Sequence, residues 1–151
     1  MLWHTLREVA WVFPLVLFIT GTLSYLMKQF GYEPEANPLV EMVAGSGSLM
    51  VWITVFVVAT IMAPLAEEIQ FRTVLYEALG SKMKPWAAAF ITATVFAATH
   101  RVPVQIPGLL ILGLVLQRVR EREESLWASI FLHAAYNFII LCLCALSLWL
   151  T

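Results

Sequence analysis

The fold is decided by residues 49–80, which read LMVWITVFVVATIMAPLAEEIQFRTVLYEALG. The run is apolar over its first half and then carries Glu67, Glu68 and Arg72 before a glycine at position 80. A helix of about 20 apolar residues crosses the hydrocarbon core of a bilayer, and glycine commonly marks the end of a helix. We therefore predict a membrane helix that stays helical past its charged residues and ends near Gly80.

The composition of the whole chain agrees with a membrane protein. Of its 151 residues, 61% are hydrophobic and 13% are charged, against roughly 45–50% and 25% in soluble domains. A soluble domain of this size would have more apolar surface than it could bury. The sequence predicts an all-α fold, a polytopic transmembrane helix bundle, that forms one integral-membrane domain over residues 1–151.

Five apolar runs supply about five membrane-embedded helices. They lie at about residues 9–27, 49–79, 86–100, 107–119 and 126–150. The first is expected to be a retained span, because it is too long for the apolar part of a signal peptide. Pro64 is expected to kink the second, and the fourth is short for a full crossing. A short interfacial helix is expected near residues 39–44.

The distribution of Lys and Arg predicts the orientation. If five spans alternate, one side holds Arg7, Arg72, Lys82, Lys84, Arg118, Arg120 and Arg122, and the other holds Lys28 and Arg101. The positive-inside rule then places the N-terminus in the cytoplasm and the C-terminus outside. A re-entrant fourth segment would change this parity.

Two classes of interaction are not expected. The net charge is −1 and no basic patch indicates nucleic acid. Cys142 and Cys144 are two residues apart in an apolar run, and such positions on a helix do not face each other. We therefore predict neither a disulfide nor a metal pair there.

The polar residues inside the apolar runs are the candidate site. Charges in hydrocarbon are costly and usually face a protein interior or a water-filled cavity. Counted from the basic turns at a rise of 1.5 Å per residue, Glu67 lies ~20 Å deep, His100 ~22 Å, His133 ~12 Å and Asn137 ~18 Å. Four polar groups from three helices fall at similar depths, which predicts a shared site.

These residue types suit hydrolysis by water. A carboxylate in a poorly solvated pocket is a good general base, and Glu67 and Glu68 diverge by about 100° on a helix, so that one can face the site while the other turns toward Arg72. His133 and the Asn137 amide are donors suited to an oxyanion. The alternative from the residues alone is structural, with an ion pair and polar contacts between helices.

Three motifs carry a resemblance to a known family. Glu67-Glu68-Ile69-Gln70-Phe71-Arg72 fits the pattern E-E-x-x-x-R, Phe96-Ala97-Ala98-Thr99-His100 fits F-x-x-x-H, and His133-Ala134-Ala135-Tyr136-Asn137 fits H-x-x-x-N. In this order on apolar helices, they resemble the CAAX protease and bacteriocin-processing (CPBP, or Abi) intramembrane glutamic endopeptidases. The motif-bearing core covers about residues 49–138.

The resemblance implies a role for each residue. Glu67 and His100 would activate the water, His133 and Asn137 would form the oxyanion site, and Glu68 and Arg72 would support them. The protein would be an endopeptidase without a cofactor, acting near the C-terminus of a lipidated CAAX-type substrate or on another membrane-bound peptide. Its cavity would open toward the cytoplasm.

Two other functions stay open on the residues. One is a zinc-dependent intramembrane hydrolase with His100, His133 and Glu67 as ligands, since three such ligands and a water make a catalytic zinc set. The chain has no H-E-x-x-H helix, and Asn is a poor zinc ligand. The other is a non-catalytic membrane immunity or scaffold protein. The residues predict no particular oligomeric state.

Overall fold

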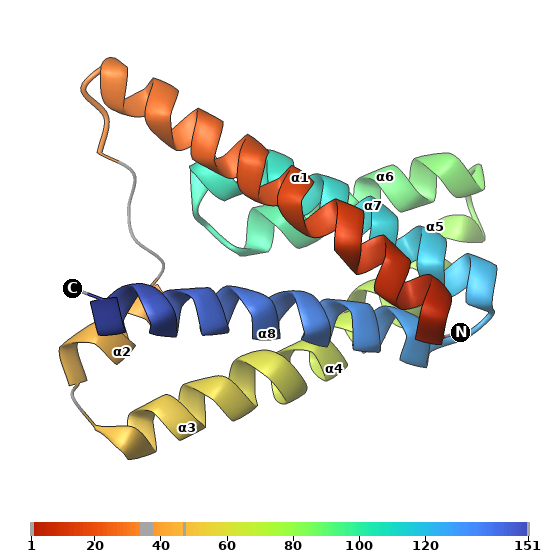
Figure 1. Cartoon of the computed structure of the whole chain (residues 1–151). Helices are drawn as coiled ribbons and strands as arrows, with labels where there is room; N and C mark the ends of the chain where they lie inside the picture. Colours follow the sequence, from red (N-terminus) through yellow and green to blue (C-terminus); the bar gives the residue numbers. More distant parts are fainter. Residues whose placement is uncertain (1, 34–37, 47, 151) are drawn as a thin grey trace.

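A computed structural model describes residues 2–33, 38–46 and 48–150, and every regular element within them is helical (Figure 1). The elements are α1 (Leu2–Gln29), α2 (Pro38–Ser46), α3 (Leu49–Val57), η1 (Val58–Met62), α4 (Ala63–Glu68), η2 (Ile69–Leu75), α5 (Tyr76–Gly80), α6 (Pro85–Thr99), η3 (Pro103–Gln105), α7 (Ile106–Glu123) and α8 (Leu126–Leu150). The all-α prediction is confirmed.

Three helical stretches of the described chain are long and apolar enough to cross a membrane: Trp3–Gln29, Leu49–Gly80 and Leu126–Leu150. A shorter apolar helix covers Pro85–Thr99. Together with α7, these make the membrane-embedded bundle of about five helices. Large apolar side chains such as Trp3, Phe18, Trp86 and Trp149 are exposed on its outside, where lipid would solvate them.

The predicted bounds hold closely, except at the first helix, where α1 already begins at Leu2 rather than near residue 9, and at the fourth helix. The fourth helix was expected to stop near Val119, with a charged turn after it, but α7 continues through Glu123. Arg120 and Arg122 lie in its last turn, where positive charge interacts favourably with the helix dipole. The interfacial helix expected near residues 39–44 lies inside α2.

The stretch Leu49–Gly80 is helical throughout, but two of its segments differ from the rest in hydrogen-bond spacing. The segments Val58–Met62 and Ile69–Leu75 have π-helical spacing, and they enclose α4, which carries the paired carboxylates. Short π segments within α-helices are frequent at functional sites because they re-aim side chains. The first of them ends just before Pro64, where a kink was expected.

Helix α7 lies at the centre of the packing. It contacts α1, α6 and α8 (Figure 1), and Leu112 and Leu116 on α7 are buried with Val12, Phe96 and Leu132 from the three neighbours. Gly113 permits the close approach of α6. A Cβ atom at position 113 would lie 3.0 Å from the Ala93 Cβ.

Ion pairs hold three chain segments at one end of the bundle. Arg122 Nη1 lies 2.6 Å from Glu8 Oε1 of α1, and Arg120 Nη2 lies 2.5 Å from Glu77 Oε1 of α5. The start of α1, the end of α5 and the end of α7 therefore share this end, on the right of Figure 1. Arg72, counted with these segments in the sequence, is instead buried in the bundle, which leaves six basic residues here.

The contact between α6 and α7 gives a prediction about stability. Gly113→Ala places a methyl group against Ala93 and 3.2 Å from Phe96 Cδ1. We expect a loss of roughly 1–3 kcal/mol, as for other overpacked cores, measured as a lower Tm in detergent. Gly80→Ala is the matched control, because nothing lies within 4 Å of its Cβ. Equal Tm values for the two variants would contradict the close packing.

Candidate active site

A buried ion pair lies behind the site. Glu68 and Arg72 are both inaccessible to solvent, and Arg72 Nε lies 3.3 Å from Glu68 Oε2. The guanidinium also donates from Nη2 to the Gly113 carbonyl at 3.2 Å, and its Cζ lies 4.9 Å from the centre of the Phe96 ring. Arg72 thereby connects its own helix to α7 and α6. As the angular divergence of the paired carboxylates suggested, Glu68 is the one turned toward Arg72.

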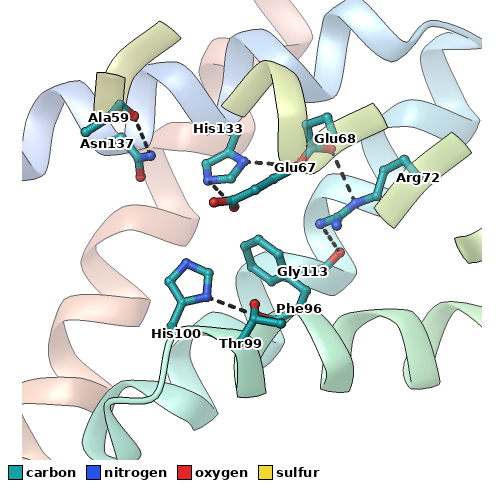
Figure 2. Close-up of polar contacts among 10 residues, drawn as sticks. All are labelled: Ala59, Glu67, Glu68, Arg72, Phe96, Thr99, His100, Gly113, His133 and Asn137. Atoms are coloured by element: carbon teal, nitrogen blue, oxygen red, sulfur yellow. Dashed lines mark hydrogen bonds and ion pairs between the residues drawn. The ribbon is translucent and has the colours of Figure 1, made fainter. Parts of the chain in front are cut away.

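His133 lies between the two carboxylates (Figure 2). Its Nδ1 is 3.0 Å from Glu68 Oε1, and its Nε2 is 3.8 Å from Glu67 Oε2. Because a carboxylate oxygen accepts, the proton of this bond belongs to Nδ1 of the ring. Glu68 thus fixes the orientation of the imidazole, and the other nitrogen faces Glu67. The Glu67 side chain is 29% exposed, whereas that of Glu68 is fully buried.

His100 stands across from this cluster (Figure 2). Its Nδ1 lies 3.0 Å from the Phe96 carbonyl oxygen, which can only accept, so Nδ1 carries the hydrogen. In the neutral imidazole, Nε2 then holds a lone pair. His100 borders a cavity of about 230 Å³ with Glu67, and a second cavity of about 240 Å³ with His133 and Asn137.

Phe96 holds these side chains apart and in place. Its buried ring makes edge contacts with His100 at 4.9 Å, with His133 at 5.6 Å and with Phe71 at 5.4 Å between ring centroids. Arg72 lies over the same ring. The sequence identified Phe96 only as the first residue of the F-x-x-x-H motif. The central position of the ring depends on tertiary packing, which that pattern does not contain.

Asn137 has a partner that the sequence did not suggest. Its Nδ2 donates to the Ala59 carbonyl oxygen at 2.8 Å (Figure 2). In the first π segment the Ala63 N–H bonds to the Val58 carbonyl, five residues back. In that spacing the donor for Ala59 would be residue 64, and Pro64 has no N–H. The Asn137 amide thus satisfies a carbonyl that a proline leaves without its backbone donor.

The structure brings some of the predicted site residues into direct contact and others only to the same cavities. Glu67, Glu68 and His133 are in one cluster with Arg72, while His100 is joined to it through the cavities. Asn137 lines the second cavity, but one of its amide hydrogens is already used. The helices whose polar groups were expected at similar depths do lie around one cluster and its two neighbouring cavities.

The zinc alternative assigns Glu67, His100 and His133 as ligands. No group of three His, Cys, Asp or Glu side chains in the described ranges, which include these three, is placed to hold a metal ion. Both histidines bond to protein oxygens through Nδ1, which leaves both Nε2 atoms free, an arrangement that metal-bound histidines share.

Comparisons with known proteins agree with this arrangement. The chain matches the family described as "Rce1-like: Type II CAAX prenyl endopeptidase Rce1-like" over residues 47–139, which include all three motifs. It is 26% identical over 119 residues to the Bacillus subtilis (strain 168) protein named "Putative membrane peptidase YdiL". That alignment covers 79% of this chain but 47% of the relative, so the chain spans about half the relative's length. No solved structure matches it.

The fold and the site define a class, which is a helical membrane protein with paired carboxylates and two histidines inside its bundle. Within that class, the chain belongs to the Rce1-like family of type II CAAX prenyl endopeptidases. The resemblance found from the motifs is confirmed.

The buried ion pair gives a second prediction. Arg72→Leu leaves the Glu68 carboxylate buried without its countercharge, and we expect a loss of ~3–5 kcal/mol. In the double variant Glu68→Gln/Arg72→Leu, the loss should be smaller than the sum of the single losses, because neither charge remains. Unfolding in detergent gives the free energies. Arg120→Leu is the control, since its partly exposed pair with Glu77 contributes under ~1 kcal/mol; additive losses at 68 and 72 would contradict the coupling.

The bond of Asn137 to Ala59 gives a third prediction. Asn137→Ala leaves the Ala59 carbonyl without this donor, at an expected cost of ~1–3 kcal/mol. In a Pro64→Ala background the N–H at position 64 is restored, and the cost of Asn137→Ala should fall below ~1 kcal/mol. The free energy of unfolding in detergent is measured for the unaltered protein, Asn137→Ala, Pro64→Ala and the double variant, which form a double-mutant cycle. An unchanged cost in the Pro64→Ala background would show that the proline does not create the need for Asn137.

Proposed function

We propose that the protein is an intramembrane endopeptidase that hydrolyses a peptide bond with a water activated by Glu67 and His100. One observation carries this proposal. A partly exposed carboxylate, Glu67, shares a cavity of about 230 Å³ with His100, whose hydrogen-bonded Nδ1 leaves Nε2 as the basic nitrogen. Membership in a family of prenyl endopeptidases supports the same reaction.

The proposed reaction needs one water and no cofactor. Glu67 accepts a proton from the water while its oxygen attacks the carbonyl carbon of the substrate. The tetrahedral intermediate then collapses, the C–N bond breaks, and the leaving amine takes up a proton delivered through Glu67 or His100 Nε2. General acid–base groups held in this way typically contribute 10²–10⁴-fold to the rate.

His133 is proposed to stabilise the negative oxygen of the intermediate. The ring is anchored through Nδ1 to Glu68, so Nε2 is the nitrogen that faces the site, and it donates to an oxyanion when it also carries a hydrogen. Asn137 is proposed to assist through the amide hydrogen that does not bond to Ala59.

The substrate is proposed to be a lipidated CAAX-type tail or another membrane-bound peptide. The family description names a CAAX prenyl endopeptidase. The end of the bundle with six basic residues is proposed to face the cytoplasm, because positive residues favour that side. The N-terminus would then be cytoplasmic, and the site is proposed to open to the same side.

One set of contacts favours the non-catalytic alternative. Arg72 bonds to Gly113 of α7, and Asn137 bonds to Ala59 of η1, so both residues also connect helices. A scaffold protein would need these contacts and nothing else. Substitution of Glu67 separates the two functions, because this carboxylate makes no hydrogen bond within the described residues and lies 3.8 Å from its closest recorded partner, His133.

Glu67→Gln is therefore the central test. It keeps the shape of the side chain and removes the base, so we expect cleavage of a farnesylated CAAX peptide in detergent to fall at least ~10²-fold with an unchanged Tm. Glu77→Gln, on the same helix, is the control and should retain activity. Full cleavage by Glu67→Gln would overturn the proposal. Loss of cleavage on chelation with recovery on adding zinc would favour the zinc hydrolase instead.

A further inference from the structure

Tyr136 is a buried side chain to which the proposed function assigns no role. It lies one turn after His133 on the same face of α8, and only 7% of it is exposed. Its ring packs edge-on against Phe13 of α1, with 5.7 Å between centroids. Its hydroxyl has no hydrogen-bond partner anywhere in residues 2–33, 38–46 and 48–150. The oxygen is not among the fully buried atoms that lack a partner, so it must border an accessible space.

The surroundings of Tyr136 identify that space. It lines the 240 Å³ cavity with His100, His133 and Asn137, and one water needs only about 15 Å³. Gln105 lines the same cavity from η3, and its carboxamide likewise has no partner among the described residues. The remaining lining is mostly apolar and comes from α1, α7 and α8: Val16, Leu17, Thr20, Leu109 and Ile140.

The cavity lining thus includes both polar and apolar side chains, and the two polar groups without a partner suit a peptide. A phenol donates one hydrogen bond, and a carboxamide both donates and accepts, as does a peptide group. Asn137, expected from the sequence to bind the oxyanion, already has Nδ2 bonded to Ala59. The Tyr136 hydroxyl has no such commitment.

We propose that Tyr136 binds the substrate, donating its hydroxyl hydrogen bond to the carbonyl oxygen of the bond to be cleaved, and that Gln105 pairs with the neighbouring peptide group. The ligand is an extended peptide segment with an apolar side chain directed at the wall from α1. This inference rests on the proposed function. No proton leaves Tyr136, because the hydroxyl only stabilises the negative oxygen while Glu67 and His100 move the protons.

Tyr136→Phe removes one oxygen atom and tests the proposal. With a farnesylated CAAX peptide as probe, we expect kcat to fall by ~10²-fold, the usual effect of losing one oxyanion donor, while KM changes less. Affinity for a farnesylated peptide with a phosphinate in place of the scissile bond should fall about tenfold. The Tm should not fall, because no internal hydrogen bond is lost.

Tyr76→Phe is the matched control. The Tyr76 hydroxyl bonds to Glu121 near the charged end of the bundle, so its removal should lower the Tm and leave kcat unchanged. This reversed pattern separates a role in substrate binding from one in stability. Gln105→Ala should raise KM more than it lowers kcat.

Each remaining outcome is decisive. Full kcat and full phosphinate affinity in Tyr136→Phe, with Glu67→Gln inactive, would overturn this inference and leave the proposed function standing. Cleavage by Glu67→Gln would overturn the proposed function itself. If the unaltered protein neither cleaves the peptide nor binds the phosphinate, both fail.

Discussion

The buried pair of Glu68 and Arg72 is the interaction on which the rest of the site depends. Two charges with no access to solvent carry a penalty of several kcal/mol each, and the pair alone does not compensate it. Arg72 also needs the Gly113 carbonyl of α7 and the Phe96 ring of α6, and Glu68 needs His133 of α8. The contacts that these two buried charges require therefore constrain the positions of α6, α7 and α8.

The two histidines of the proposed site are each held in place by a hydrogen bond to the helical framework. His133 is anchored by a charged group, and His100 is anchored by the main chain of its own helix. Both rings use Nδ1 for attachment, which leaves both Nε2 atoms for chemistry. A site made of helical side chains packed around one phenyl ring needs no loop to hold its reacting groups.

Hydropathy located the helices, because the length of an apolar run can be compared directly with the thickness of the bilayer. The fifth predicted helix, 126–150, matches α8 to the residue. Depth, however, contains no information about rotation around a helix axis. The π spacing on both sides of α4, the bond of Asn137 to Ala59 and the unpartnered Tyr136 hydroxyl all depend on rotation. The motifs could therefore predict candidate site residues and the pairing of a carboxylate with Arg72, but not the partners of His100 and Asn137.

The position of His100 has a consequence for how reactants reach the site. Its ring forms part of the wall of two separate cavities, one beside Glu67 and one beside His133 and Tyr136. A hydrolase embedded in lipid needs water in its active site while an apolar substrate is bound there. In the proposed mechanism, water would enter through the cavity beside Glu67 and the peptide through the cavity beside His133 and Tyr136, so a bound peptide need not block the supply of water. Because His100 borders both cavities, the two reactants would come into contact beside its ring.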